Sequence, residues 1–166
     1  EALTRTERYI EQNQKSLTVI IAIIVLIIGG YLAFQKFYIK PMEQDAKAEM
    51  FVAEQYFERD SFNLALNGDN NYMGFLYIID EYGMTKTANL AKYYAGICYL
   101  KSGDYEQAIE YLKDFDADDE MVEPVSTGAI GDAYAELGEY DHAVEYYEEA
   151  AEKGENKFTA PIYLKK

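Results

Sequence analysis

The sequence predicts an all-α protein in which a single N-terminal transmembrane helix is followed by a solenoid of helix–turn–helix units. Three observations predict this fold class: an uncharged apolar run near the N-terminus, apolar residues at helical spacing without strand signals of comparable strength, and a set of residues that recurs 35 positions later. The chain has 166 residues and is 49% hydrophobic, which is enough for a folded core.

Charge is distributed unevenly along the chain, whose formal net charge is −15. The first 40 residues carry five basic and three acidic side chains, whereas residues 41–166 carry 10 basic and 27 acidic ones. A surface this acidic repels phosphate groups, so we expect no nucleic-acid partner. The chain begins with Glu1 rather than Met, and we expect it to be a piece of a longer protein.

The uncharged run covers residues 16–35, and these 20 residues are long enough for a helix to cross a bilayer core. No polar face interrupts the run, which disfavours a buried helix of a soluble core. A cleaved signal peptide is the other alternative, but its apolar region usually has about 7–15 residues and ends in small ones. Bulky Tyr31, Leu32 and Phe34 crowd the end of this run. We therefore predict an uncleaved transmembrane helix over residues 16–40.

The basic residues that flank the run indicate its orientation. Three precede the run and two follow it: Arg5, Arg8 and Lys15, then Lys36 and Lys40. By the positive-inside rule, this difference favours a cytoplasmic N-terminal segment over residues 1–15, with the rest of the chain beyond the membrane.

Five residue types recur in one order in two stretches of the chain. Each matched pair is 35 residues apart: Gly96/Gly131, Tyr99/Tyr134, Gly103/Gly138, Tyr105/Tyr140 and Ala108/Ala143. The first glycine of each set lets two antiparallel helices approach closely, and the second can take the left-handed conformation that ends a helix. We expect the four tyrosines to fill space between helices and the two alanines to lie where the second helix crosses the first.

These residues resemble the tetratricopeptide repeat family. The glycine and tyrosine of the family pattern W-x2-L-G-x2-Y are met at residues 92–99 and 127–134. Lys92 and Thr127 stand in place of the tryptophan, and Ala95 and Ile130 stand in place of the leucine. The resemblance covers about residues 89–153. It implies helical hairpins that cannot bury their apolar faces alone and therefore stack on their neighbours.

The resemblance also implies a domain organisation for the part of the chain that follows the span. In the irregular first unit, we expect a first helix over about residues 42–60 and a second over residues 72–82. The complete organisation is an irregular first unit over 41–88 with an insertion near 61–71, repeats over 89–123 and 124–155, and the start of a further, truncated repeat over 156–166.

The layout as a whole resembles the YfgM-like family of bacterial envelope proteins: a short basic N-terminus, one span and an acidic repeat domain. Asn89-Leu90-Ala91 and Tyr94-Ala95-Gly96 are also similar to that family. The resemblance implies an inner-membrane protein with periplasmic repeats, associated with the Sec translocon. Its implied partners are translocon subunits, envelope chaperones or secreted polypeptides. A structural subunit of another envelope assembly, for outer-membrane assembly, secretion or gliding, is the alternative.

Tetratricopeptide arrays bind partners on the concave face that the first helices line. The resemblance places seven residues there, which we call the predicted groove: Tyr93, Ile97, Leu100, Lys101, Asp132, Ala135 and Glu136. Such a face suits a segment with apolar anchors and some positive charge. The carboxylate-clamp subtype needs Lys and Asn where this chain has other residues, so we reject that specificity. The alternative is that these side chains, and Gly128 beside them, simply pack against neighbouring helices.

We predict no enzymatic activity, no catalytic or metal-binding residue, no cofactor and no small-molecule substrate. One cysteine and one histidine leave little material for a zinc site or for a nucleophile and its base. We expect Cys98 to be buried and His142 to lie at the surface. An acidic run lacks the ordered spacing of a calcium loop, so we interpret it as a solvated turn: Asp116, Asp118, Asp119 and Glu120.

Overall fold

The computed structural model describes residues 2–117, 122–153 and 163, with side chains from residue 13 onward. Every regular element in these residues is a helix, and an isolated antiparallel bridge joins Gly68 to Met73. The prediction of an all-α chain is therefore confirmed. The chain divides into two compact units, residues 1–41 and residues 42–166, which are described in turn.

The first unit is a helix whose apolar side chains face outward. It consists of α1 (Ala2–Phe34) and a π-helical turn, η1 (Gln35–Ile39). The large apolar side chains of residues 19–28 are 49–75% exposed. Soluble proteins rarely expose so large an apolar surface to water, whereas lipid would solvate it well. This helix is long and apolar enough to cross a membrane, so it is a candidate membrane span.

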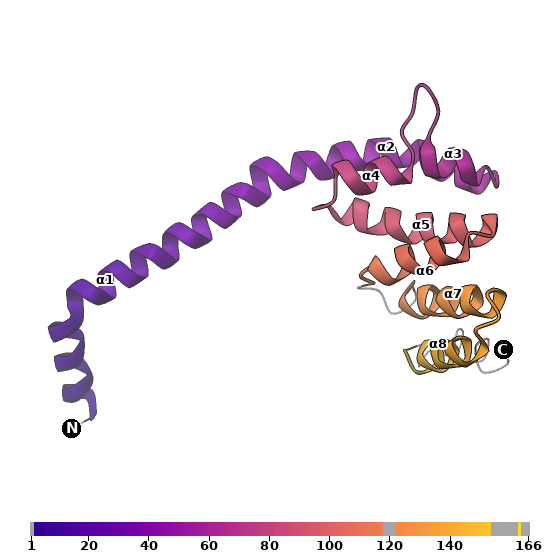
Figure 1. Cartoon of the computed structure of the whole chain (residues 1–166). Coiled ribbons are helices and arrows are strands. Elements are labelled where there is room, and N and C mark those ends of the chain that lie inside the picture. Colours follow the sequence, from indigo (N-terminus) through magenta and orange to yellow (C-terminus); the bar gives the residue numbers. More distant parts are fainter. Residues whose placement is uncertain (1, 118–121, 154–162, 164–166) are drawn as a thin grey trace. The chain divides into compact units, whose positions relative to one another are not determined.

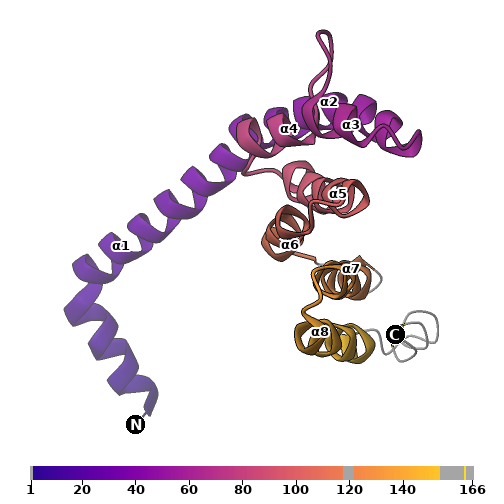
Figure 2. The same cartoon turned by 45° about the vertical axis from the view of Figure 1, so that its right-hand side comes forward.

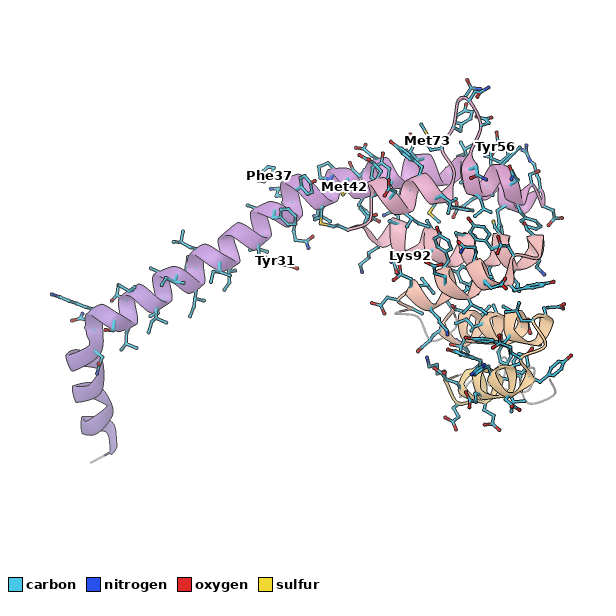
Figure 3. The ribbon with its side chains drawn as sticks, viewed as in Figure 1. Tyr31, Phe37, Met42, Tyr56, Met73 and Lys92 are labelled. Atoms are coloured by element: carbon cyan, nitrogen blue, oxygen red, sulfur yellow. The ribbon has the colours of Figure 1, made fainter. Side chains whose placement is uncertain are left out.

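Aromatic side chains gather where the apolar run ends. The rings of Phe34 and Tyr38 stack with centroids 5.1 Å apart, and the Lys36 ammonium lies 5.7 Å from the centroid of the Phe37 ring. Tyr31 and Phe37 project outward from the helix (Figure 3). Amphipathic rings and a lysine in this position suit the headgroup zone of a bilayer.

The second unit begins with three helices around one apolar cluster. They are α2 (Lys40–Glu58), α3 (Phe62–Asn67) and α4 (Phe75–Glu81). Buried side chains from all three pack against α5 (Lys86–Ser102) in the same cluster, among them Met50, Ala53, Leu66, Phe75 and Ile78. The segment 61–71, interpreted from the sequence as an insertion, holds α3 and contributes to this core.

A small hairpin separates α3 from α4. Gly68 and Met73 form its antiparallel bridge, and neither Gly68 nor Gly74 has room for a Cβ atom against the opposing backbone. Tyr72 and Met73 belong to this hairpin rather than to a helix. The helix predicted over residues 72–82 therefore starts only at Phe75.

The carboxylate of Asp69 organises the turn of this hairpin. It accepts hydrogen bonds from the backbone amides of Asn71 and Tyr72 at 2.7 and 2.8 Å, and from the Tyr56 hydroxyl at 2.7 Å. These bonds, above all the one from Tyr56, hold the pKa of Asp69 below its usual range. The turn is thereby fastened to α2.

The remaining helices form a stack in which each contacts the next. They are α5 (Lys86–Ser102), α6 (Tyr105–Asp114), α7 (Val122–Glu136) and α8 (Tyr140–Lys153). They follow one another in this order in both views of the molecule (Figures 1 and 2). A second apolar cluster joins α6 to α7 through Ala108, Ile109, Leu112, Ala129, Ile130 and Ala133.

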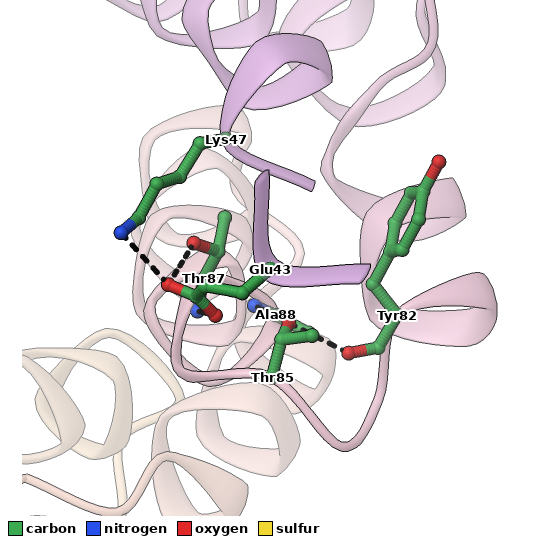
Figure 4. Close-up of polar contacts among 6 residues, drawn as sticks. All are labelled: Glu43, Lys47, Tyr82, Thr85, Thr87 and Ala88. Atoms are coloured by element: carbon green, nitrogen blue, oxygen red, sulfur yellow. Dashed lines mark hydrogen bonds and ion pairs between the residues drawn. The ribbon is translucent and has the colours of Figure 1, made fainter. Parts of the chain in front are cut away.

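The start of α5 is fastened by residues of α2 (Figure 4). The Glu43 carboxylate accepts hydrogen bonds from the Thr87 hydroxyl at 3.0 Å and the Thr87 amide at 3.3 Å, and it pairs with Lys47 at 3.1 Å. A carboxylate is favoured at a helix N-terminus because the first amides there lack partners within the helix. We call this arrangement the Glu43 clasp. Thr85 adds an N-cap, its hydroxyl oxygen accepting from the Ala88 amide at 3.0 Å.

Candidate partner-binding groove

Close contacts at two glycines hold each hairpin of the stack together. A Cβ atom on Gly96 would lie 2.5 Å from Cγ of Leu112 on α6, and one on Gly131 would lie 2.7 Å from the Tyr147 ring on α8. Both glycines are buried. The predicted close approach of two antiparallel helices therefore occurs in both hairpins.

The turns after α5 and α7 share one hydrogen-bond pattern. Gly103 has φ +84° and Gly138 has φ +78°, so both take the predicted left-handed conformation. After α5, the Asp104 amide donates to the Tyr99 carbonyl at 3.0 Å. After α7, the Glu139 amide donates to the Tyr134 carbonyl at 2.9 Å. These two bonds, one in each turn, are typical of a Schellman motif.

Three of the four repeat tyrosines contribute to packing between helices, and one does not. Tyr99 stacks on Tyr111 and Tyr134 stacks on Tyr146, each with ring centroids 5.4 Å apart. Tyr105 packs on the cluster between α6 and α7. The expectation for Tyr140 was wrong, because its side chain is 69% exposed. Tyr105 also reaches the following hairpin, where its hydroxyl lies 3.4 Å from the Glu136 carboxylate.

The two repeat alanines are both buried on the second helices, but their surroundings differ. Ala108 of α6 is fully enclosed and belongs to the apolar cluster that joins α6 to α7. Ala143 of α8 is buried at the helix crossing, where its carbonyl oxygen would lie 3.3 Å from a Cβ atom on Gly131. Both alanines are thus small, buried residues of the second helices, and Ala143 lies at the crossing of α7 and α8 as expected. The cluster around Ala108 is completed by the following helix, α7.

The four groove residues predicted on α5 lie near each other but differ in exposure. Tyr93, Ile97 and Leu100 are half-buried and pack against the cluster between α6 and α7. The Tyr93 ring also lies 5.5 Å from the ring of Phe115. Of these four residues, only Lys101 is exposed. The apolar part of the predicted groove is thus a shallow surface backed by the core.

Two of the three groove residues predicted on α7 accept hydrogen bonds from tyrosine hydroxyls. Asp132 accepts one from the Tyr147 hydroxyl at 2.7 Å, and Glu136 accepts a longer one from the Tyr105 hydroxyl at 3.4 Å. Burial and the Asp132 carboxylate together raise the pKa of Tyr147. Ala135 is half-buried and Glu136 is exposed. Gly128, one turn before Asp132, is covered by the ring of Tyr163.

Lysine and asparagine side chains on α5 fasten the end of α6, a role that sequence reasoning missed. Lys92 stands in the position of the family tryptophan. Its ammonium donates to the Asp114 carbonyl at 3.2 Å and pairs with the Asp114 carboxylate at 2.6 Å. Asn89 pairs with the Asp116 backbone in both directions, at 2.7 and 3.0 Å. These polar contacts connect α5 to the exit of α6, where a tryptophan would act by packing.

A cavity of about 350 Å³ lies away from the predicted groove, between α6, α7 and α8. Its walls include Ser126, Thr127 and Ile130 of α7, together with Lys113 and Lys153. Lys113 donates to the Tyr134 hydroxyl at 2.8 Å, and Lys153 pairs with Glu123 and Glu149 at 3.0 and 2.8 Å. Both ammonium groups are therefore engaged by residues of the stack.

Cys98 and His142 lie in different surroundings. Cys98 is fully buried, and burial raises the pKa of its thiol to about 12, so it is protonated at neutral pH. His142 is exposed and pairs with Glu139 at 2.9 Å. Among the described residues, no group of three or more His, Cys, Asp or Glu side chains could hold a metal ion. Of the acidic run, Asp118, Asp119 and Glu120 lie outside the described residues.

The comparisons with known proteins agree with this geometry. Two models described as tetratricopeptide repeat match the chain, one over residues 90–117 and the other over residues 128–152. They cover α5 with α6, and most of α7 with α8. No curated protein and no solved structure matches the chain. The C-terminal half of this chain therefore carries tetratricopeptide repeat motifs, units that typically serve as non-catalytic scaffolds for protein partners.

Proposed function

We propose that this protein is a membrane-anchored scaffold that binds other proteins through its repeats at the extracytoplasmic face of the bacterial inner membrane. One observation carries the proposal: an exposed apolar helix of spanning length and a stack of tetratricopeptide hairpins occur in one chain. Anchoring raises the effective concentration of the repeats near any membrane-bound partner. The excess of basic residues before the span supports a cytoplasmic N-terminus.

The partner that we propose is the Sec translocon, with the repeats linking secreted polypeptides to envelope chaperones. Support comes from the layout of the sequence, which resembles the YfgM-like family. The strong negative charge of residues 41–166 also favours encounter with segments that carry positive charge. The predicted groove offers apolar surface at Tyr93, Ile97 and Leu100 and exposed charge at Lys101 and Glu136.

Site-specific photo-crosslinking in intact membranes tests the partner and the side of the membrane together. A benzophenone amino acid replaces Ile24 in the span, Lys101 in the predicted groove or, as a matched control, exposed Glu106 on α6. We expect a translocon subunit at Ile24, a secreted polypeptide or chaperone at Lys101, and fewer products at Glu106. Products from another envelope assembly at Ile24 would contradict the translocon as partner and favour the alternative, a structural subunit of that assembly. The absence of membrane-protein products at Ile24, or of any product at Lys101, would contradict the scaffold.

A further inference from the structure

The ring of Tyr163 is seated on the α7 part of the predicted groove. Its side chain is only 9% exposed. A Cβ atom on Gly128 would collide with Cε1, Cζ and Oη of this ring. The space above Gly128 is therefore filled by the Tyr163 ring, and it exists because residue 128 lacks a side chain.

The walls around this ring come from α5, α7 and α8. The Tyr147 ring of α8 lies roughly parallel to it, with centroids 6.5 Å apart and planes 15° apart. The hydroxyl of Tyr147 is itself fixed by its bond to Asp132 of α7. Burial, the nearby Asp132 carboxylate and the phenol of Tyr93 on α5 raise the pKa of Tyr163. The Tyr163 side chain thus lies among residues of the predicted groove rather than at the surface.

The repeat register explains why a tyrosine meets a glycine here. Tyr93, Gly128 and Tyr163 follow each other at the repeat spacing of 35 residues, so they hold the same position in successive units. In the α7–α8 hairpin that position is Gly128, which has no side chain. A side chain from the next unit can therefore enter between α5 and α8, which a second tyrosine at residue 128 would prevent.

We propose that Gly128, Asp132 and Tyr147 form a socket for a tyrosine side chain, and that Tyr163 of the same chain is its resident occupant. While Tyr163 is seated, the groove is closed around Gly128 and Asp132, and a protein partner is confined to the α5 part and to exposed Glu136. The confinement of a partner rests on the proposed function, whereas the socket itself does not. Displacement of Tyr163 opens the α7 part.

Tyrosine acetylation of the full chain in detergent micelles tests the socket without any partner. Mass spectrometry compares the rates at Tyr163 and at Tyr140, which is 69% exposed. We expect Tyr163 to react about tenfold more slowly than Tyr140, because the ring must first leave the socket. Gly128→Ala fills the socket and should bring Tyr163 close to the rate of Tyr140.

The stacked tyrosines Tyr99 and Tyr134 serve as internal controls for unfolding in this experiment. If Gly128→Ala accelerates them as well, that variant has lost its fold, and the wild-type ratio of Tyr163 to Tyr140 decides alone. Equal rates at Tyr163 and Tyr140 in the wild-type chain would overturn the socket. So would an unchanged Tyr163 rate in a folded Gly128→Ala variant.

Photo-crosslinking at Ala135 and Lys101 tests whether the seated ring excludes partners. In the wild-type chain we expect partner products at Lys101 and few at Ala135. Tyr163→Ala should raise the yield at Ala135 several-fold and leave the yield at Lys101 unchanged. An unchanged yield at Ala135 beside clear products at Lys101 would overturn the exclusion. No products at either position would contradict the proposed function, and the acetylation rates would still decide the socket.

Discussion

The hairpins α5–α6 and α7–α8 share one backbone design but differ in how their side chains use it. Each ends its first helix on a left-handed glycine, and each stacks a tyrosine of its first helix on one twelve residues later. The side chain over the crossing glycine is Leu112 in one hairpin and Tyr147 in the other. The contacts of residues inside a hairpin are thus set by the hairpin itself, whereas the contacts of residues that face outward depend on the next hairpin.

The largest expected effect comes from filling the glycine crossings. Gly96→Val places new atoms against fully enclosed Leu112 and should lower the free energy of unfolding by about 3 kcal/mol. Gly131→Val should cost less, because half-buried Tyr147 can move toward solvent. Urea unfolding followed by circular dichroism in micelles measures both, with Ala48→Val on the exposed face of α2 as control. Equal losses would mean that the two crossings are equivalent after all.

A smaller difference is expected between the two tyrosines that follow the turns. Tyr105→Ala removes a ring that packs on the α6–α7 cluster and should cost about 1–2 kcal/mol. Tyr140→Ala removes an exposed ring and should stay within about 0.5 kcal/mol of the wild type. The same urea titration measures both variants. A loss at Tyr140 comparable to that at Tyr105 would show that another residue packs on Tyr140.

The Glu43 clasp distinguishes the start of α5 from the start of α7, where Val122 holds the position equivalent to Thr87. Glu43→Ala should cost about 1 kcal/mol at pH 7, because two hydrogen bonds and an ion pair are lost. Asp45→Ala, an exposed change on the same helix, is the control. An equal effect of the two substitutions would argue against the clasp.

The stability that the clasp contributes should also depend on pH. Burial opposes ionisation of Glu43, but the bonds from Lys47 and Thr87 outweigh it and hold the pKa below 4.5. The unfolded chain then binds this proton more readily than the folded one. The contribution is present above about pH 4.5 and is lost as the pH falls through the folded pKa. Wild type and Glu43→Ala should therefore converge between about pH 5 and pH 3, and parallel curves would contradict this reasoning.

The smallest difference is expected between the two turns, where the losses should be equal. Gly103→Ala and Gly138→Ala each force a side chain into the left-handed region, at a cost of about 1 kcal/mol. Neither new Cβ atom would meet a neighbour closer than 4.0 Å, so the cost is one of the backbone alone. Asparagine at either position should cost less than alanine. Unequal losses in thermal unfolding would show that the turns are not equivalent.

The repeat spacing carried most of what the sequence could predict. The 35-residue period gave the two hairpins, the close approach at Gly96 and Gly131, and the backbone conformation at Gly103 and Gly138, because each depends on contacts within one hairpin. The stacked partners Tyr111 and Tyr146 were missed although they obey the same period. Extending the alignment by one further turn would have found them.

The same period failed where a position depends on the following unit. Tyr140 matches Tyr105 in the sequence, yet Tyr105 packs on the cluster between α6 and α7 whereas Tyr140 is exposed. Residue identity alone cannot distinguish the two hairpins in this respect, because the difference lies in what packs against them.

Other features leave no local pattern in the sequence. The bond from Thr87 to Glu43 joins residues 44 positions apart, and only the packing of α2 on α5 brings them together. The hairpin at Asp69 depends on Tyr56 of α2 in the same way. The repeat register placed the residues of the predicted groove on α5 and α7. It did not predict that Tyr163 would cover Gly128, because this depends on the volume that each neighbouring unit leaves free.

Because Cys98 is buried, the folded wild-type chain should not be labelled by reagents that react with thiols. This is the only cysteine of the chain, it is fully enclosed, and burial raises the pKa of its thiol to about 12, so the thiol is protonated at neutral pH. A maleimide therefore has no native target while the protein is folded. A cysteine introduced at Lys101 reports by itself which compartment the repeats face, and the wild-type chain supplies the blank.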